Sequence, residues 1–182
     1  MRSPPARPAP SPGKMVLQDG RASVGTTRLD ESPIAQVRAW APIIEESTKA
    51  IELDPGFARA YFLRARYRGR KDPVGAIADL DQAIRLMPDY PEAYIVRAQA
   101  WADMGKQLRA ISDLSTAMRL DPANEYAYIR RAMAFAALRM PDEAVKDSAS
   151  AIRCRPVVKE WLRRDRMPAC VTESAAFQQL IK

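Results

Sequence analysis

Apolar and small residues recur along this chain in two alternating blocks, and each block repeats after 33 or 34 residues. The first block reads PGFARAYFLRARYR at 55–68, PDYPEAYIVRAQAW at 88–101 and PANEYAYIRRAMAF at 122–135. The second reads IIEESTKAIELDP at 43–55, AIADLDQAIRLMP at 76–88, AISDLSTAMRLDP at 110–122 and AVKDSASAIRCRP at 144–156. Self-similarity at a fixed period of this length is typical of a repeat architecture.

Each block predicts one helix, so a repeat unit is a pair of helices. Pro55, Pro88 and Pro122 close the units, because proline lacks the amide hydrogen and its ring clashes with the preceding turn. Turns within the units are expected near residues 71–73, 105–106 and 140–142. Asp72, which precedes Pro73, is expected to cap a second helix.

Alanines stand at equivalent places in every unit and predict how the helices pack. They are Ala65, Ala98 and Ala132 in the first helices, and Ala76, Ala110, Ala144, Ala83, Ala117 and Ala151 in the second helices. Small residues at fixed places let helices approach closely, while tyrosines in the first helices supply bulk. One helix pair cannot bury its own apolar face, so neighbouring units must stack.

This pattern resembles the tetratricopeptide-repeat (TPR) family. In the second full unit the matching residues are Tyr94, Ala98, Trp101, Ala110, Leu114, Ala117 and Pro122. The resemblance implies an all-α fold, a right-handed superhelix of antiparallel helix pairs (a TPR solenoid) with C-terminal capping helices. The first full unit departs from the pattern with Arg68 in the place of Trp101, and Ser148 replaces a large apolar residue in the third.

The predicted TPR domain spans residues 34–156. It consists of a half-repeat at 34–55 and repeats at about 57–88, 91–122 and 125–156, and residues 34–40 are expected to form a short, degenerate first helix. Residues 1–33 are proline-rich and basic and are predicted to be disordered, either as a plain tail or as a ligand with a proline motif. Residues 157–182 are expected to form two short capping helices, which would cover the end of the solenoid with Trp161, Leu162, Phe177 and Leu180.

Charged residues also repeat. Arg64, Arg97 and Arg131 are equivalent in the first helices, and Asp79, Asp113 and Asp147 are equivalent in the second helices. We expect each arginine to pair with an aspartate of its own or the adjacent unit, as a structural feature of the repeat. An exposed pair of this kind would contribute only about 0–1 kcal/mol.

The composition argues against an enzyme. The chain has no histidine, and its pattern contains no metal-ligand cluster, glycine-rich phosphate loop or nucleophile motif, so neither a cofactor nor a metal is expected. Cys154 aligns with leucines and is expected to be buried, whereas Cys170 is expected in a loop. Two cysteines, no membrane-length apolar run and no signal-peptide core favour a cytoplasmic protein.

The TPR resemblance implies that the first helices line a concave face where a partner segment docks. The residues placed there are Arg59, Phe62, Arg66 and Arg70 in the first unit, Glu92, Ile95, Gln99 and Asp103 in the second, and Tyr126, Ile129 and Met133 in the third. This set is basic at one end and apolar at the other, which favours a protein or peptide with acidic and apolar residues. Alternatively, the chain's own C-terminus covers the apolar end.

The sequence therefore predicts a non-enzymatic protein–protein interaction scaffold or adaptor. The lysine and asparagine clamp with which some TPR proteins hold a C-terminal carboxylate is absent, which argues against binding of a chaperone tail. The alternatives are an RNA-binding helical repeat protein and a self-assembling module. The net charge of +7 fits nucleic acid, but residues 34–156 hold 19 basic and 16 acidic residues, and no side-chain code for bases repeats in the units.

Overall fold

The computed structural model describes residues 33–69, 71–164 and 167–182. The described residues form ten helices and no strand. The helices are α1 (Pro33–Leu53), α2 (Ala58–Arg68), α3 (Pro73–Leu86), α4 (Pro91–Asp103), α5 (Gln107–Leu120), α6 (Glu125–Ala137), α7 (Pro141–Cys154), α8 (Val158–Arg163), α9 (Ala169–Thr172) and α10 (Ala175–Ile181). The prediction for residues 1–33 concerns a segment that lies, apart from Pro33, outside the described residues.

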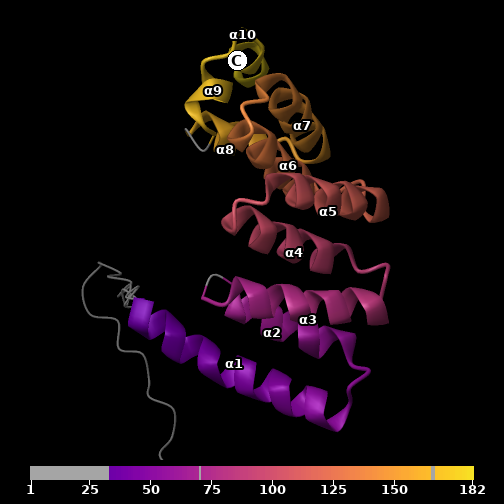
Figure 1. Cartoon of the computed structure of the whole chain (residues 1–182). Coiled ribbons are helices and arrows are strands. Elements are labelled where there is room, and N and C mark those ends of the chain that lie inside the picture. Colours follow the sequence, from indigo (N-terminus) through magenta and orange to yellow (C-terminus); the bar gives the residue numbers. More distant parts are fainter. Residues whose placement is uncertain (1–32, 70, 165–166) are drawn as a thin grey trace, which may run out of the picture.

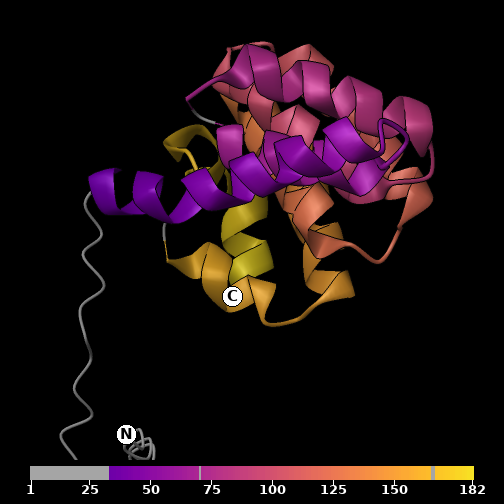
Figure 2. The ribbon, with the colours of Figure 1, turned by 90° about the horizontal axis from the view of Figure 1, so that it is seen from below.

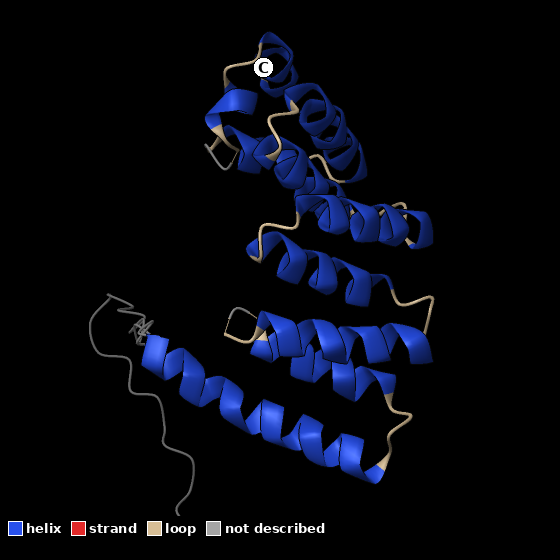
Figure 3. Ribbon diagram, viewed as in Figure 1, coloured by secondary structure: helices blue, strands red, loops and turns tan. Residues whose placement is uncertain are grey.

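The helices stack in chain order as antiparallel pairs. Each of α2 to α7 packs on the helix before it and the helix after it, and the pairs α2–α3, α4–α5 and α6–α7 are the three full units (Figure 1). The first helices also touch one another, α2 on α4 and α4 on α6. Loops join the helices at both edges of the stack (Figure 3). The predicted all-α solenoid is confirmed.

The turns between the helices have the chemistry that the sequence predicts. Asp72 precedes α3, and its Oδ1 accepts a hydrogen bond from the Gly75 amide at 2.8 Å. Gly105 lies between α4 and α5 with φ +72°, a left-handed conformation that glycine adopts without a steric penalty. The first and second units therefore close through local interactions of their own.

The core is a column of small side chains with larger ones between them. Ala65, Ala76 and Ala83 are fully buried with Leu80 in the first unit, and their equivalents are buried in the second and third units. Because alanine at these places brings neighbouring helices close together, the packing confirms the role predicted for the repeated alanines.

Helix α1 is longer than predicted. Residues 34–40 do not form a separate first helix, because α1 continues through Pro42 as one helix of 21 residues. Trp40 packs against Tyr67 of α2, with ring centroids 6.3 Å apart. This contact holds the turn of α1 around Trp40 against α2. Seen from below, α1 lies across the end of the stack and its first turns extend past the other helices (Figure 2).

The C-terminal cap consists of α8, α9 and α10. The sequence predicts two of these helices; α9 has only four residues and was not predicted. Leu162 of α8 and Phe177 of α10 are fully buried against α6 and α7, while Trp161 and Leu180 are half-buried. No helix in the described part of the chain is both long and apolar enough to cross a membrane.

Both cysteines differ from their predictions. Cys154 is exposed, because it ends α7 and the element that follows is the six-residue α8 instead of a full first helix. Cys170 lies in α9 and is half-buried, with its Sγ 3.4 Å from the carbonyl oxygen of Ala136.

Candidate functional site: the concave face of the first helices

A ladder of arginines fixes the first helices on the second helices. Arg97 of α4 donates from Nε and Nη2 to Asp113 of α5 at 2.8 and 2.7 Å. The same two-bond pairing joins Arg64 to Asp79 and Arg131 to Asp147 within their own units. The predicted pairing is confirmed, but the pairs are not exposed, since the aspartate side chains are only 7–11% accessible.

Each arginine of the ladder also reaches the preceding helix of the stack. Nη1 of Arg97 donates to Asp81 of α3 at 2.7 Å, and Nη1 of Arg131 donates to Ser115 of α5 at 2.9 Å. The hydrogen bonds to Asp113 raise the pKa of Arg97, while its burial opposes this effect. Each first helix is therefore fastened to the helices on both of its sides, which holds its inner face in a defined orientation.

The basic end of the concave face is built around an aromatic pair. Phe62 of α2 packs against Tyr90, which precedes α4, with ring centroids 4.9 Å apart. Burial raises the pKa of Tyr90, Glu92 adds to this effect, and Arg59 and Arg66 oppose it, so both arginines lie near the phenol. Both arginines are exposed, and neither has a carboxylate within ion-pair distance among the described side chains.

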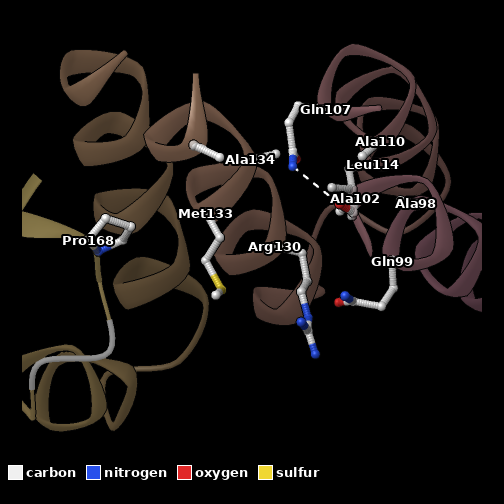
Figure 4. Close-up of a pocket in the computed structure, with 11 residues that line it drawn as sticks. Ala98, Gln99, Ala102, Gln107, Ala110, Leu114, Arg130, Met133, Ala134 and Pro168 are labelled. Atoms are coloured by element: carbon white, nitrogen blue, oxygen red, sulfur yellow. Dashed lines mark hydrogen bonds between the residues drawn. The ribbon is translucent and has the colours of Figure 1, made fainter. Parts of the chain in front are cut away.

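An apolar hollow of about 270 Å³ lies between α4 and α6 (Figure 4). We call it the α4–α6 hollow. Its walls are Ala98, Gln99, Ala102, Gln107, Ala110, Leu114, Arg130, Met133, Ala134, Ala137 and Pro168. Arg130 and Gln99 project to the same side of it and form its polar edge (Figure 4). The hollow is large enough to hold a large apolar side chain, and it has a cation beside it.

Arg130 is held at the edge of this hollow by Tyr126. Its guanidinium carbon lies 4.7 Å from the centre of the Tyr126 ring, and Nη2 donates to the phenol oxygen. A guanidinium stacked on an aromatic ring is pre-organised for planar acceptors such as carboxylates. Across the hollow, Gln99 donates to Asp103 at 2.7 Å.

The structure separates the predicted groove residues into two groups. Arg59, Arg66, Glu92, Asp103 and Tyr126 are exposed, and Gln99 and Met133 are half-buried. By contrast, Phe62, Ile95 and Ile129 are only 6–9% accessible. Each of them packs into a core cluster, and their part in partner binding stays a prediction. Arg70 lies outside the described residues.

The apolar end of the concave face is covered in part by the chain itself. Ile129 and Ala136 share a core with the C-terminal cap, and Met133 packs against the same core. Pro168, just before α9, closes one side of the α4–α6 hollow. The sequence reasoning missed most of this lining, including Arg130 and Pro168, and it missed Tyr90 as the partner of Phe62. The described residues contain no group of three or more acidic or cysteine side chains arranged for a metal.

Comparisons with known proteins agree with this geometry. No family model and no curated protein sequence matches the chain. Among solved structures, MamA superposes with a TM-score of 0.62 at 16% identity, over 81% of this chain and 91% of MamA. TTC0263, a thermophilic TPR protein of Thermus thermophilus, gives 0.59 at 17% identity, over 80% and 93%. The first TPR domain of Spaghetti (RPAP3), bound to an HSP90 peptide, gives 0.54 at 26% identity, over 59% and 88%.

These likenesses, with the stacked helix pairs and their repeated contacts, define the class of this protein as a helical-repeat solenoid. Its repeats are of the tetratricopeptide type, and the chain has the TPR fold.

Proposed function

We propose that this protein is a non-enzymatic scaffold or adaptor that holds a segment of another protein on the concave face of its first helices. The observation that carries the proposal is the α4–α6 hollow, an apolar space beside the half-buried Arg130. A fold that binds an HSP90 peptide in Spaghetti (RPAP3) supports the assignment to the same class of function. The cytoplasmic location expected from the sequence stays a prediction.

The chemistry of the face defines the segment that fits it. A large apolar side chain fills the hollow between Met133 and Ala137, and an adjacent carboxylate binds Arg130. Further acidic groups bind Arg59 and Arg66 at the other end of the face, where both cations are exposed. The buried side chains of Phe62, Ile95 and Ile129 pack in the core and hold the first helices in place.

A peptide-display selection on the immobilised protein tests the proposal. We expect selected peptides to share an aspartate or glutamate next to a large apolar residue. Ala137→Trp fills the hollow, and Arg130→Glu reverses the charge at its edge; each variant should weaken binding by about tenfold or more. The matched controls are Ala78→Trp and Arg119→Glu, at exposed positions of the second helices α3 and α5, and both should bind like the wild type.

Equal far-UV circular dichroism and urea midpoints in all variants are required, so that a loss of binding reports the site and not unfolding. Peptides that bind the groove variants and the control variants equally would show that the site lies elsewhere. RNA binding that falls steeply with salt, without any selected peptide, would instead favour the nucleic-acid alternative.

A further inference from the structure

Helix α1 takes the place of a second helix in a unit whose first helix is missing from the described part of the chain. Residues 43–55 are equivalent in sequence to 76–88, 110–122 and 144–156. In the structure α1 packs on α2 as α3 packs on α4 and as α5 packs on α6. In the first two complete units, the second helix packs on two first helices, one from its own unit and one from the next unit. Among the described helices, α1 packs mainly on one, α2, which belongs to the next unit.

Among the described residues, a stripe of α1 is less covered than the equivalent places of the complete units, which are buried. Ile43 is equivalent to Ala76, Ala110 and Ala144, which are fully buried, yet it is only half-buried itself. Ala50 is likewise half-buried, while its equivalents Ala83, Ala117 and Ala151 are fully buried. Glu46 is exposed, whereas its equivalents are the buried aspartates of the arginine ladder.

These positions form one continuous surface. Ile43, Glu46 and Ala50 are three and four residues apart, which places them on the same side of a helix. Leu53, one turn further, is 88% accessible. We call Ile43, Glu46, Ala50 and Leu53 the α1 stripe: apolar positions around a single carboxylate.

The complete units show which chemistry covers such a stripe. In each of them the first helix brings an arginine to the aspartate equivalent to Glu46 and an alanine directly after that arginine. These arginine–alanine pairs are Arg64–Ala65, Arg97–Ala98 and Arg131–Ala132, and the alanines are at most 1% accessible. The stripe therefore matches a helix whose arginine is followed by a small residue.

We propose that the α1 stripe docks an amphipathic helix of a partner protein, laid antiparallel to α1 in the place of the missing first helix. Its arginine pairs with the carboxylate of Glu46, and its small residue lets the two backbones approach over Ala50. The partner helix thus completes the first unit in trans. This surface is separate from the α4–α6 hollow, so the two sites are independent of each other.

The probe for this site is a fluorescent peptide that copies residues 90–105, which contain α4, Arg97 and Ala98. Binding to the full chain is measured by fluorescence anisotropy, with protein concentrations up to about 1 mM because a short isolated helix is marginal in water. We expect Glu46→Arg to weaken binding by about tenfold or more. The matched control Glu52→Arg, an exposed charge on the opposite side of α1, should bind like the wild type.

Charge exchange makes the test specific. The peptide with Arg97→Glu should bind the wild type poorly and recover its affinity for the Glu46→Arg protein. A peptide that displaces α4 from the protein's own stack would bind without regard to Glu46, and this result would overturn the proposal. So would the absence of binding to the wild type. Ala137→Trp in the hollow should leave peptide binding unchanged, which separates this site from the groove.

Related measurements distinguish two other segments that could cover the stripe: a second copy of the chain and residues 1–32. A wild-type dimer in sedimentation that dissociates in Glu46→Arg would show that a second copy covers the stripe. A rise in peptide affinity when Arg21→Glu and Arg28→Glu are introduced in the full chain would show that residues 1–32 cover it. Either result would overturn the assignment to a partner protein.

Discussion

Replacement of Arg97 by methionine is the most direct test of the arginine ladder. Methionine keeps an unbranched side chain but removes a cation that binds Asp113 with two hydrogen bonds and Asp81 with one. The Asp113 side chain is only 11% accessible, so little water can replace the guanidinium. Removal of one partner of a buried ion pair costs about 3–5 kcal/mol, because the other charge stays buried without compensation.

Partial exposure lowers this figure for Arg97, whose side chain is 19% accessible. The bond to Asp81 adds little, about 0–1 kcal/mol, since that carboxylate is 53% accessible. We therefore expect Arg97→Met to lower the free energy of unfolding by about 2–4 kcal/mol. Urea denaturation followed by far-UV circular dichroism measures this difference.

Two further variants show whether the loss comes from the unpaired charge. Arg119→Met removes an exposed arginine of α5 and should change the free energy of unfolding by less than about 0.5 kcal/mol. The double variant Arg97→Met with Asp113→Leu removes both charges and should be more stable than Arg97→Met alone. If Arg97→Met is as stable as the wild type, or if the double variant shows the sum of two losses, the ladder does not stabilise the stack in the way inferred here.

Three other predictions concern the cap, a turn and a titration. Phe177→Ala should lower the free energy of unfolding by about 3–5 kcal/mol in the same urea assay, because the ring is fully buried in the C-terminal cap; an unchanged midpoint would show that the cap does not unfold with the solenoid. Gly105→Ala should cost about 1 kcal/mol from its left-handed backbone alone, since an added Cβ has no atom within 4 Å; a larger loss would point to a steric clash. Burial raises the pKa of Tyr90, so the stability that it contributes is complete below its ordinary pKa of about 10 and is lost as the pH rises through the higher folded value. The difference in tyrosinate absorbance between the wild type and Tyr90→Phe should therefore develop above about pH 10, and a difference centred below that pH would contradict the shift.

The helices of the full units follow from the sequence because their pattern recurs three times, and two of the turns carry local signals. Asp72 and Gly105 act within one turn of the chain, and the repeated alanines mark the closest approaches between helices. The partners in the arginine ladder were also predictable, since a charge that recurs at one place needs a counter-charge that recurs at another. Their burial was not, because it depends on how far adjacent helices cover the pair.

The groove residues were harder to predict for a related reason. A sequence places Phe62, Ile95 and Ile129 on the inward half of their helices, but it does not show how each helix is rotated in the superhelix. A small rotation moves such a side chain from the surface into the core. The lining by Pro168 could not be foreseen either, because it comes from a segment outside the repeats and from a cap whose α9 is too short to show a periodic pattern.

The two ends of this stack are unlike: α7 is covered by the C-terminal cap, whereas the described residues leave the outer stripe of α1 uncovered. In a linear array where each element contacts only its neighbours, loss of structure begins at the end with fewer contacts. Amide hydrogens of α1 should therefore exchange with solvent first, and protection should increase from α2 toward α7. Because Arg97 bonds helices on both of its sides, the fraying of one unit must break a link to the next, which couples the unfolding of neighbouring units.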